Sequence, residues 1–220
     1  TISSDSFGSL VFSGEGGSSS TTARDATAAG DIWDQFDDET GLEPTGVGSG
    51  DNMMMYTLPA IMDGVSDNVS YLPTGTAADS AVGYGINYTG IEGLAVNFAT
   101  GDGTTVGGGT DATVMKASYA IGSLTAAYSS YEYDTAGTSS DDDVTGYKLS
   151  YTISDELSAS YASETVEEGT KEAEYESVSA SYTAGGMTIT ATMSEGTDID
   201  GTTTATEDRE RWALSASFAF

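Results

Sequence analysis

The feature that most constrains this chain is the regular alternation of apolar and small polar residues along many of its segments. In the last segment, apolar residues occupy every second position: Trp212, Leu214, Ala216, Phe218 and Phe220. Small residues and one arginine lie between them: Arg211, Ala213, Ser215, Ser217 and Ala219. A helix would scatter both sets around its axis, whereas a strand sorts them onto opposite faces. The alternation therefore predicts β-strands.

About twelve segments share this alternation, and short and long connectors alternate between them. The segments are 6–14, 52–59, 67–73, 80–89, 94–100, 111–121, 124–133, 143–153, 157–166, 174–184, 187–195 and 210–220. Tight turns on one side and long loops on the other are typical of membrane barrels. We therefore predict an all-β fold in which residues 1–220 form one transmembrane antiparallel up-and-down β-barrel domain.

The composition of the two predicted faces favours a membrane barrel over a soluble sheet. A soluble β-sandwich also alternates, because one face of each sheet is buried against the other sheet. Here the second face is almost uniformly Ser, Thr, Gly, Ala and Asn, while the charges gather in the loops. Lipid tolerates no open sheet edge, so membrane-spanning strands must close into a barrel. We therefore expect a protein of the bacterial outer membrane rather than a secreted sandwich such as a lectin.

The chain has 35 acidic and six basic residues, and it contains neither cysteine nor histidine. The lack of cysteine excludes disulfides and thiolate chemistry. The lack of histidine removes the usual general base at neutral pH and the commonest zinc ligand. A net charge of −29 opposes nucleic-acid binding, since no basic surface can displace phosphate counterions. We therefore expect neither an enzyme nor a nucleic-acid-binding protein.

Both ends of the chain carry motifs that resemble known outer-membrane proteins. Ser217-Phe218-Ala219-Phe220 resembles their C-terminal assembly signal, in which Phe218 and Phe220 would take part. The segment 4–14, SDSFGSLVFSG, resembles the turn and strand before the constriction loop of alphaproteobacterial general-diffusion porins. The segment 30–38, GDIWDQFDD, resembles that acidic loop, and 53–58, MMMYTL, resembles the strand that leaves it.

The resemblance to these porins implies a passive pore for small hydrophilic solutes and ions. It also implies a homotrimer embedded in membrane lipids that include lipopolysaccharide. The family has sixteen strands, with the constriction loop after the fifth. Here the loop follows the first predicted strand, so the first four strands of the family are missing from this chain. The alternative is a complete barrel of twelve strands, because an even count leaves both termini on one side.

The long irregular segment 15–51 is the predicted constriction loop. A short helix within it would place Asp31, Asp34 and Asp38 on one face, at spacings of three and seven residues. On the resemblance to porins, the acidic residues at the narrowest point are Asp31, Asp34, Asp37, Asp38 and Glu39. Trp33 and Phe36 would anchor the loop to the wall. The alternative is an outside loop whose carboxylates are ordinary surface charge.

Three of the six basic residues fall on the small-residue face, which in a barrel is the lumen: Lys116, Lys148 and Arg211. Basic groups on the wall opposite an acidic loop would produce a transverse field that orients dipolar solutes. Lys116 could instead lie in water at a strand end. Because acidic residues outnumber basic ones, we predict selectivity for cations.

Acidic clusters could bind divalent ions, although no cofactor is required. Asp141, Asp142 and Asp143 form the candidate site for Ca²⁺ or Mg²⁺, and porins of this type carry acidic calcium sites. The spacing does not match an EF-hand, and a solvated loop explains the cluster equally well. A second function is therefore a non-conducting adhesive barrel with divalent-binding loops. Its lumen would need large or charged plugging residues, whereas the small residues here leave room for water.

Overall fold

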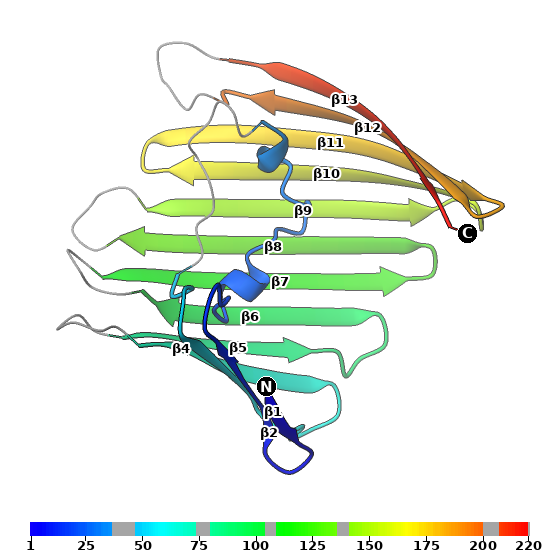
Figure 1. Ribbon diagram of the computed structural model, residues 1–220. Helices are drawn as coiled ribbons and strands as arrows, with labels where there is room; N and C mark the ends of the chain where they lie inside the picture. The colour runs from blue at the N-terminus through cyan, green and yellow to red at the C-terminus, as the bar shows by residue number, and fades with distance from the viewer. Residues whose placement is uncertain (37–46, 74–79, 104–108, 136–140, 200–206, 220) are drawn as a thin grey trace.

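The computed structural model describes residues 1–36, 47–73, 80–103, 109–135, 141–199 and 207–219. Within these ranges the chain forms one antiparallel sheet of 13 strands, in which each strand pairs with its neighbours in sequence (Figure 1). The first seven are β1 (Ile2–Ser4), β2 (Gly8–Ser13), β3 (Met53–Thr57), β4 (Val65–Leu72), β5 (Ala81–Tyr88), β6 (Leu94–Asp102) and β7 (Thr110–Ile121). The remaining six are β8 (Leu124–Thr135), β9 (Asp142–Thr152), β10 (Leu157–Glu168), β11 (Lys171–Ala184), β12 (Met187–Thr197) and β13 (Arg209–Phe218).

The predicted all-β, up-and-down antiparallel architecture is confirmed, and the twelve predicted strands correspond to β2–β13. The additional strand β1 has three residues, which is too short to show alternation. Several strands extend farther than predicted toward the long connectors. Glu167 and Glu172, for example, belong to β10 and β11 and are paired across the sheet rather than lying in a loop. The sequence prediction assigned these acidic residues to a loop, and the predicted strands were therefore too short.

The sheet curves strongly but does not close, because β1 and β13 form its two edges. Each step from one strand to the next reverses direction, so the first and thirteenth strands run the same way. Among the described residues, no helix is long and apolar enough to cross a membrane. Two short 3-10 helices, η1 (Thr22–Arg24) and η2 (Trp33–Phe36), lie in the segment between β2 and β3.

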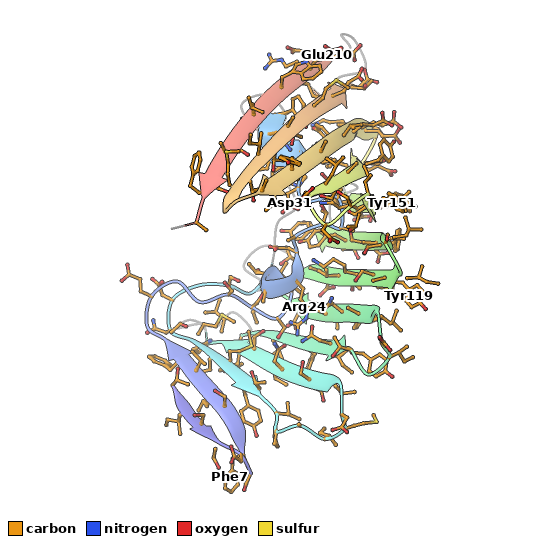
Figure 2. All side chains as sticks on the ribbon, turned by 90° about the vertical axis from the view of Figure 1, so that its right-hand side faces the viewer. Phe7, Arg24, Asp31, Tyr119, Tyr151 and Glu210 are labelled. Carbon is orange, nitrogen blue, oxygen red and sulfur yellow. The ribbon has the colours of Figure 1, made fainter. Side chains whose placement is uncertain are left out.

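The convex face of the sheet carries the large apolar side chains. Figure 2 shows Tyr119 and Tyr151 on this side, and 47% and 52% of their surfaces are exposed. The strand register aligns them in rows across the sheet, as in Leu149, Tyr161, Val178, Met193 and Trp212. An apolar outer surface made of such rows is the pattern expected of strands in contact with lipid.

The concave face holds the described parts of the segment between β2 and β3, residues 14–36 and 47–52, which we call the inner loop, and the buried core lies beneath it (Figure 2). Ile32 and Phe36 of the inner loop are buried against inward-facing residues near the long-connector ends of the strands. These wall residues include Val114, Tyr131, Val144, Val166 and Tyr175. The expectation that the inner face is almost uniformly small and polar is therefore wrong for the part of the wall beneath the inner loop. There the wall carries apolar side chains against which the loop packs.

Candidate functional site: the inner loop and the concave wall

The inner loop lies along one row of inward-facing residues that crosses the sheet from β5 to β12. The register places these residues side by side on successive strands: Asn87, Asn97, Lys116, Ser129, Gly146, Glu164, Tyr175 and Gly196. We call this set the docking row. At the start of the inner loop, Gly17 and Gly50 exchange backbone hydrogen bonds of 2.9 and 3.0 Å, which join its two ends. The two ends of the inner loop are thus joined by this backbone bridge.

Glu164 is the central polar contact of the docking row. It is fully buried, and its Oε2 accepts hydrogen bonds from the backbone N–H groups of Ile32 at 2.7 Å and Trp33 at 3.2 Å. Its other oxygen, Oε1, has no hydrogen-bond partner among the described residues. A buried carboxylate that accepts two backbone N–H groups makes charge-assisted hydrogen bonds, which are stronger than neutral ones. Glu164 therefore holds the chain just before η2 against β10.

The apolar contacts of η2 reinforce this attachment. Ile32 and Phe36 are only 1% and 6% exposed, and the Phe36 ring lies 5.6 Å from the ring of Tyr175 on β11. Trp33 is partly buried and packs against the same core. The two aromatic residues predicted as loop anchors thus do contact the wall. Ser194 of β12 adds a hydrogen bond of 3.0 Å to the side-chain carbonyl of Gln35.

Arg24 fixes the other half of the inner loop. Its buried guanidinium donates to Asn87 Oδ1 at 3.0 Å, to the Ser20 carbonyl at 2.9 Å and to Asn68 Oδ1 at 3.3 Å. Burial lowers the pKa of Arg24 from its ordinary value. Gly85 on β5 permits this close approach, because a Cβ atom there would overlap the guanidinium. A glycine in a strand often marks such an approach.

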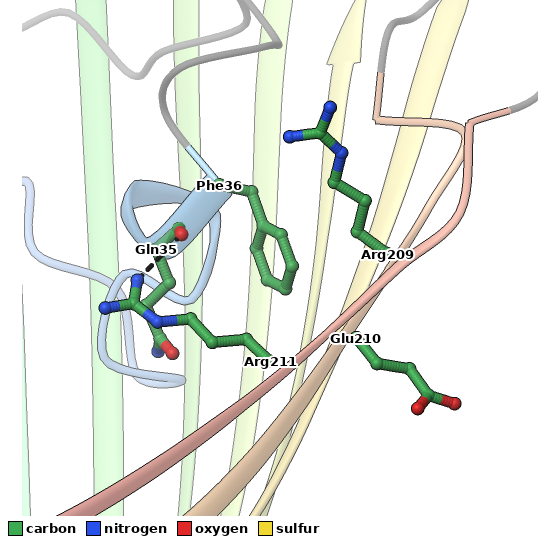
Figure 3. Close-up of a pocket in the computed structure, with 5 residues that line it drawn as sticks. All are labelled: Gln35, Phe36, Arg209, Glu210 and Arg211. Carbon is green, nitrogen blue, oxygen red and sulfur yellow. Dashed lines mark hydrogen bonds between the residues drawn. The ribbon is translucent and has the colours of Figure 1, made fainter.

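The predicted basic wall residues lie beneath the inner loop rather than across a gap from it. Lys116 Nζ donates to the carbonyl of Ala26 at 2.8 Å, and Arg211 Nη1 donates to the carbonyl of Gln35 at 2.8 Å. Figure 3 shows Arg211 reaching η2 while Glu210, the next residue back, points away from it. Lys148 also faces the inner loop, with Nζ 3.9 Å from where a Cβ atom of Gly30 would lie.

The predicted acidic residues take several different positions. Asp31 has a positive φ of 52° and folds back on its own loop, where Oδ1 accepts the Thr27 N–H at 2.8 Å. Asp34 is exposed in the single 3-10 turn of η2. Asp37, Asp38 and Glu39 lie outside the described residues. The predicted helical face shared by Asp31 and Asp34 is not formed, because Asp31 precedes the turn in a left-handed conformation.

Asp25 is an acidic residue of the inner loop that sequence reasoning did not single out. Burial raises its pKa above the usual value, and the nearby Asp31 charge raises it further. Hydrogen bonding to the Ala26 backbone and the charge of Lys116 act in the opposite direction, but burial has the larger effect.

The candidate metal site is not assembled. Asp142 and Asp143 are consecutive residues of β9, so their side chains point to opposite faces of the sheet. Asp141 precedes the strand. The described residues contain no group of three or more carboxylates that could hold a metal ion. The sequence proximity of Asp141, Asp142 and Asp143 was misleading because a strand separates neighbours that a loop could gather.

The candidate C-terminal signal lies at the edge strand. Phe218 is the last residue of β13, is 62% exposed and pairs with Met187 of β12. Phe220 lies outside the described residues.

Beyond the inner loop, toward the short turns, the concave wall is lined with hydroxyl groups. Ser181 and Thr190 are hydrogen bonded at 2.9 Å, as are Thr183 and Thr188. A hollow of about 220 Å³ lies beside them, between β9, β10 and β11, and includes Lys148. This part of the wall is therefore polar and open, as the small-residue face predicts.

Sequence reasoning missed Glu164 and Arg24, although each left a weak signal. Glu164 is an acidic residue on the small-residue face of a strand, where its neighbours in sequence are mostly Ser, Ala and Thr. Arg24 is one of only six basic residues and is surrounded by a Ser/Thr/Ala-rich segment. Neither signal identifies the residues that Glu164 and Arg24 contact, because the docking row is made of residues from eight different strands.

Comparisons with known proteins were informative only for the structure. No protein-family model and no curated protein sequence matches the chain. Among solved structures, it is similar to outer-membrane expressed OmpT of Vibrio cholerae, with a TM-score of 0.59 and 16% identity over 96% of this chain and 77% of that chain. A loop L8 deletion mutant of the same protein gives a TM-score of 0.57, 17% identity and coverages of 96% and 76%.

The fold is that of an outer-membrane β-barrel. At this identity the similarity shows the fold alone, which includes the up-and-down order of the strands. It supports the predicted outer-membrane architecture but does not single out the alphaproteobacterial porin family.

Proposed function

We propose that this chain forms a passive pore of a bacterial outer membrane that admits small hydrophilic solutes and ions. The inner loop narrows the passage without filling it. The observation that carries this proposal is the division of the concave face into two levels. The inner loop covers the docking row, while the hydroxyl-lined wall on the short-turn side is open. A water-filled lumen needs such a polar, unplugged wall.

The convex face supports a location in lipid. Large apolar side chains are exposed across the sheet, including Tyr84, Ile86, Tyr147, Leu149, Tyr151, Trp212 and Leu214. Exposed apolar surface of this extent would be a liability for a soluble monomer and fits contact with membrane lipids. We expect lipopolysaccharide among these lipids, and a homotrimer as the assembly, from the resemblance to porins.

The two edges of the sheet, β1 and β13, are not paired with each other in the structure. Open edges are not tolerated in lipid, and β1 and β13 run in the same direction. Antiparallel closure between them therefore needs an odd number of additional strands. Three additional strands would give sixteen, the number in the porin family that the sequence resembles; the four missing strands inferred from the sequence remain a prediction.

Selectivity for cations follows from how the basic groups are used. Arg24, Lys116 and Arg211 donate to oxygens of the inner loop and wall, whereas Asp34 is exposed on the inner loop. Three of the basic groups are thus engaged with the inner loop or the wall, and Asp34 presents an exposed carboxylate. Permeant cations would be enriched by this field. We assign no catalytic role to the chain.

The test is electrical recording of the native full-length protein in planar lipid bilayers. We expect a conducting channel whose reversal potential in a KCl gradient has the sign of K⁺ preference. Asp34→Asn should reduce this preference, and Asp155→Asn, at an exposed turn after β9, should leave it unchanged. Anion preference would refute the selectivity. Absence of conductance would refute the pore and favour the non-conducting adhesive barrel.

A further inference from the structure

A second feature of the concave face is a polar pocket of about 230 Å³ between η1 and strands β4–β7. It is lined by Ala23, Arg24, Asn68, Asn87, Asn97 and Lys116. The register makes Asn87, Asn97 and Lys116 direct neighbours on β5, β6 and β7, so the three side chains project from adjacent strands into one space. Figure 2 shows Arg24 on the inner loop, on the concave side of the sheet.

The hydrogen bonds around Arg24 determine which atoms remain for a ligand. A guanidinium has donors but no acceptor, so the oxygens of Asn68 and Asn87 must face it, at 3.3 and 3.0 Å. The amide nitrogens of these residues then point elsewhere. Asn87 Nδ2 donates to Ser66 Oγ at 3.0 Å. Arg24 thus occupies the side-chain oxygens of Asn68 and Asn87, and the polar groups of the pocket that remain for a ligand are hydrogen-bond donors.

Several donors remain available in the pocket. Among the described residues, Arg24 Nη2, Asn68 Nδ2 and the Asn97 amide have no hydrogen-bond partner. Lys116 Nζ has three protons and donates one of them, to Ala26. The pocket therefore offers two cations and at least two amide groups, within a chain whose net charge is −29. A ligand that satisfies these groups must supply acceptor oxygens and negative charge.

We propose that this pocket is a binding subsite for small organic carboxylates. The carboxylate would lie between Arg24 and Lys116, with the amides of Asn68 and Asn97 donating to its oxygens. Guanidinium and ammonium groups form charge-assisted hydrogen bonds with a carboxylate, and these bonds are stronger than hydrogen bonds between neutral groups. Asp25, whose charge interacts with that of Lys116, would in its ionised form repel a second negative charge, so the site suits monocarboxylates. This inference rests on the proposed function only in requiring that the concave face is wet.

The test measures binding of [1-¹³C]butyrate to the native full-length protein in detergent micelles by NMR, with uncharged butyramide as the matched ligand. We expect saturable binding of butyrate and none of butyramide. Lys116→Gln should weaken binding about tenfold or more, since it removes a charge-assisted contact. Asn97→Ala should weaken binding less, and it breaks no hydrogen bond of the inner loop. Lys171→Gln, at the β10–β11 turn, is the control that should bind as wild type.

Equal binding of butyrate and butyramide, or a Lys116→Gln variant that binds like wild type, would overturn the subsite. Because binding in micelles does not depend on conduction, the two proposals fail separately. A protein that binds butyrate but conducts no current retains the subsite and loses the pore. A protein that conducts but binds no butyrate retains the pore and loses the subsite.

Discussion

Replacing Glu164 with leucine should release the inner loop from the wall. The substitution removes the acceptor of two backbone N–H groups, those of Ile32 and Trp33. A hydrogen bond to a charged group contributes about 1.5–3 kcal/mol net, so the two together stabilise the docked loop by about 3–6 kcal/mol. Because Oε1 has no partner among the described residues, burial of the carboxylate offsets part of this, and we expect the lower end.

A loss of about 3 kcal/mol corresponds to an increase of about 100-fold in the population of the undocked loop. Native-state amide hydrogen exchange, followed by mass spectrometry, measures this population directly through peptides that cover residues 27–36. Glu164→Gln, which keeps a neutral acceptor at the same place, should lie between wild type and Glu164→Leu. The strands themselves should retain their protection, since the loop contacts are not part of the sheet ladder.

The matched control is Glu167→Leu, on the same strand but exposed and facing away from the inner loop. It should leave exchange of residues 27–36 unchanged. If Glu164→Leu accelerates this exchange no more than the control does, the carboxylate does not hold the loop and the reasoning fails.

Three further perturbations probe the same loop. Phe36→Ala should lower the free energy that holds the inner loop on the wall by about 3–5 kcal/mol, because it leaves a cavity beside Tyr175. Limited proteolysis within residues 14–52 should therefore become faster. Unchanged cleavage would argue against the packing of Phe36 on the wall. Gly85→Val should displace the Arg24 guanidinium and weaken butyrate binding, whereas an affinity equal to wild type would contradict the assigned contact. The raised pKa of Asp25 favours its neutral form in the docked state, so docking should strengthen as pH falls through that pKa and weaken above it. Asp25→Asn should therefore slow loop exchange at pH 7 and match wild type in acid; an unaltered pH profile would exclude Asp25 as the cause.

The sequence predicted the sheet well because period-two alternation is a local property. In β9, for example, Tyr147 and Leu149 face out while Lys148 and Ser150 face in, as their positions alone indicate. The exceptions are residues whose role depends on a partner far along the chain. Tyr175 and Val144 face inward although they are apolar, because Phe36 and Ile32 cover them.

The candidate site could be predicted only in outline for the same reason. Trp33 and Phe36 were predicted as loop anchors from the resemblance to porins, and Lys116 and Arg211 as inward-facing wall residues from strand parity. Their hydrogen-bond partners could not be predicted, since the contact of Arg211 with the Gln35 carbonyl depends on the register of every strand between them. The grouping of Asp141 with its neighbours did not anticipate that Asp142 and Asp143 belong to a strand, in which consecutive side chains point to opposite faces.

The attachment of the inner loop also constrains the order in which this protein folds. Its contacts join residues that are 101, 132 and 176 positions apart, reaching Ser129, Glu164 and Arg211 in turn. Long-range contacts of this kind form late, since the intervening chain must first be ordered. The inner loop lies in the first quarter of the sequence, but its contact with Arg211 can form only after β13 has joined the sheet. A folding intermediate that lacks β13 would therefore lack the contact between Arg211 and the Gln35 carbonyl, and formation of this last contact would report completion of the sheet.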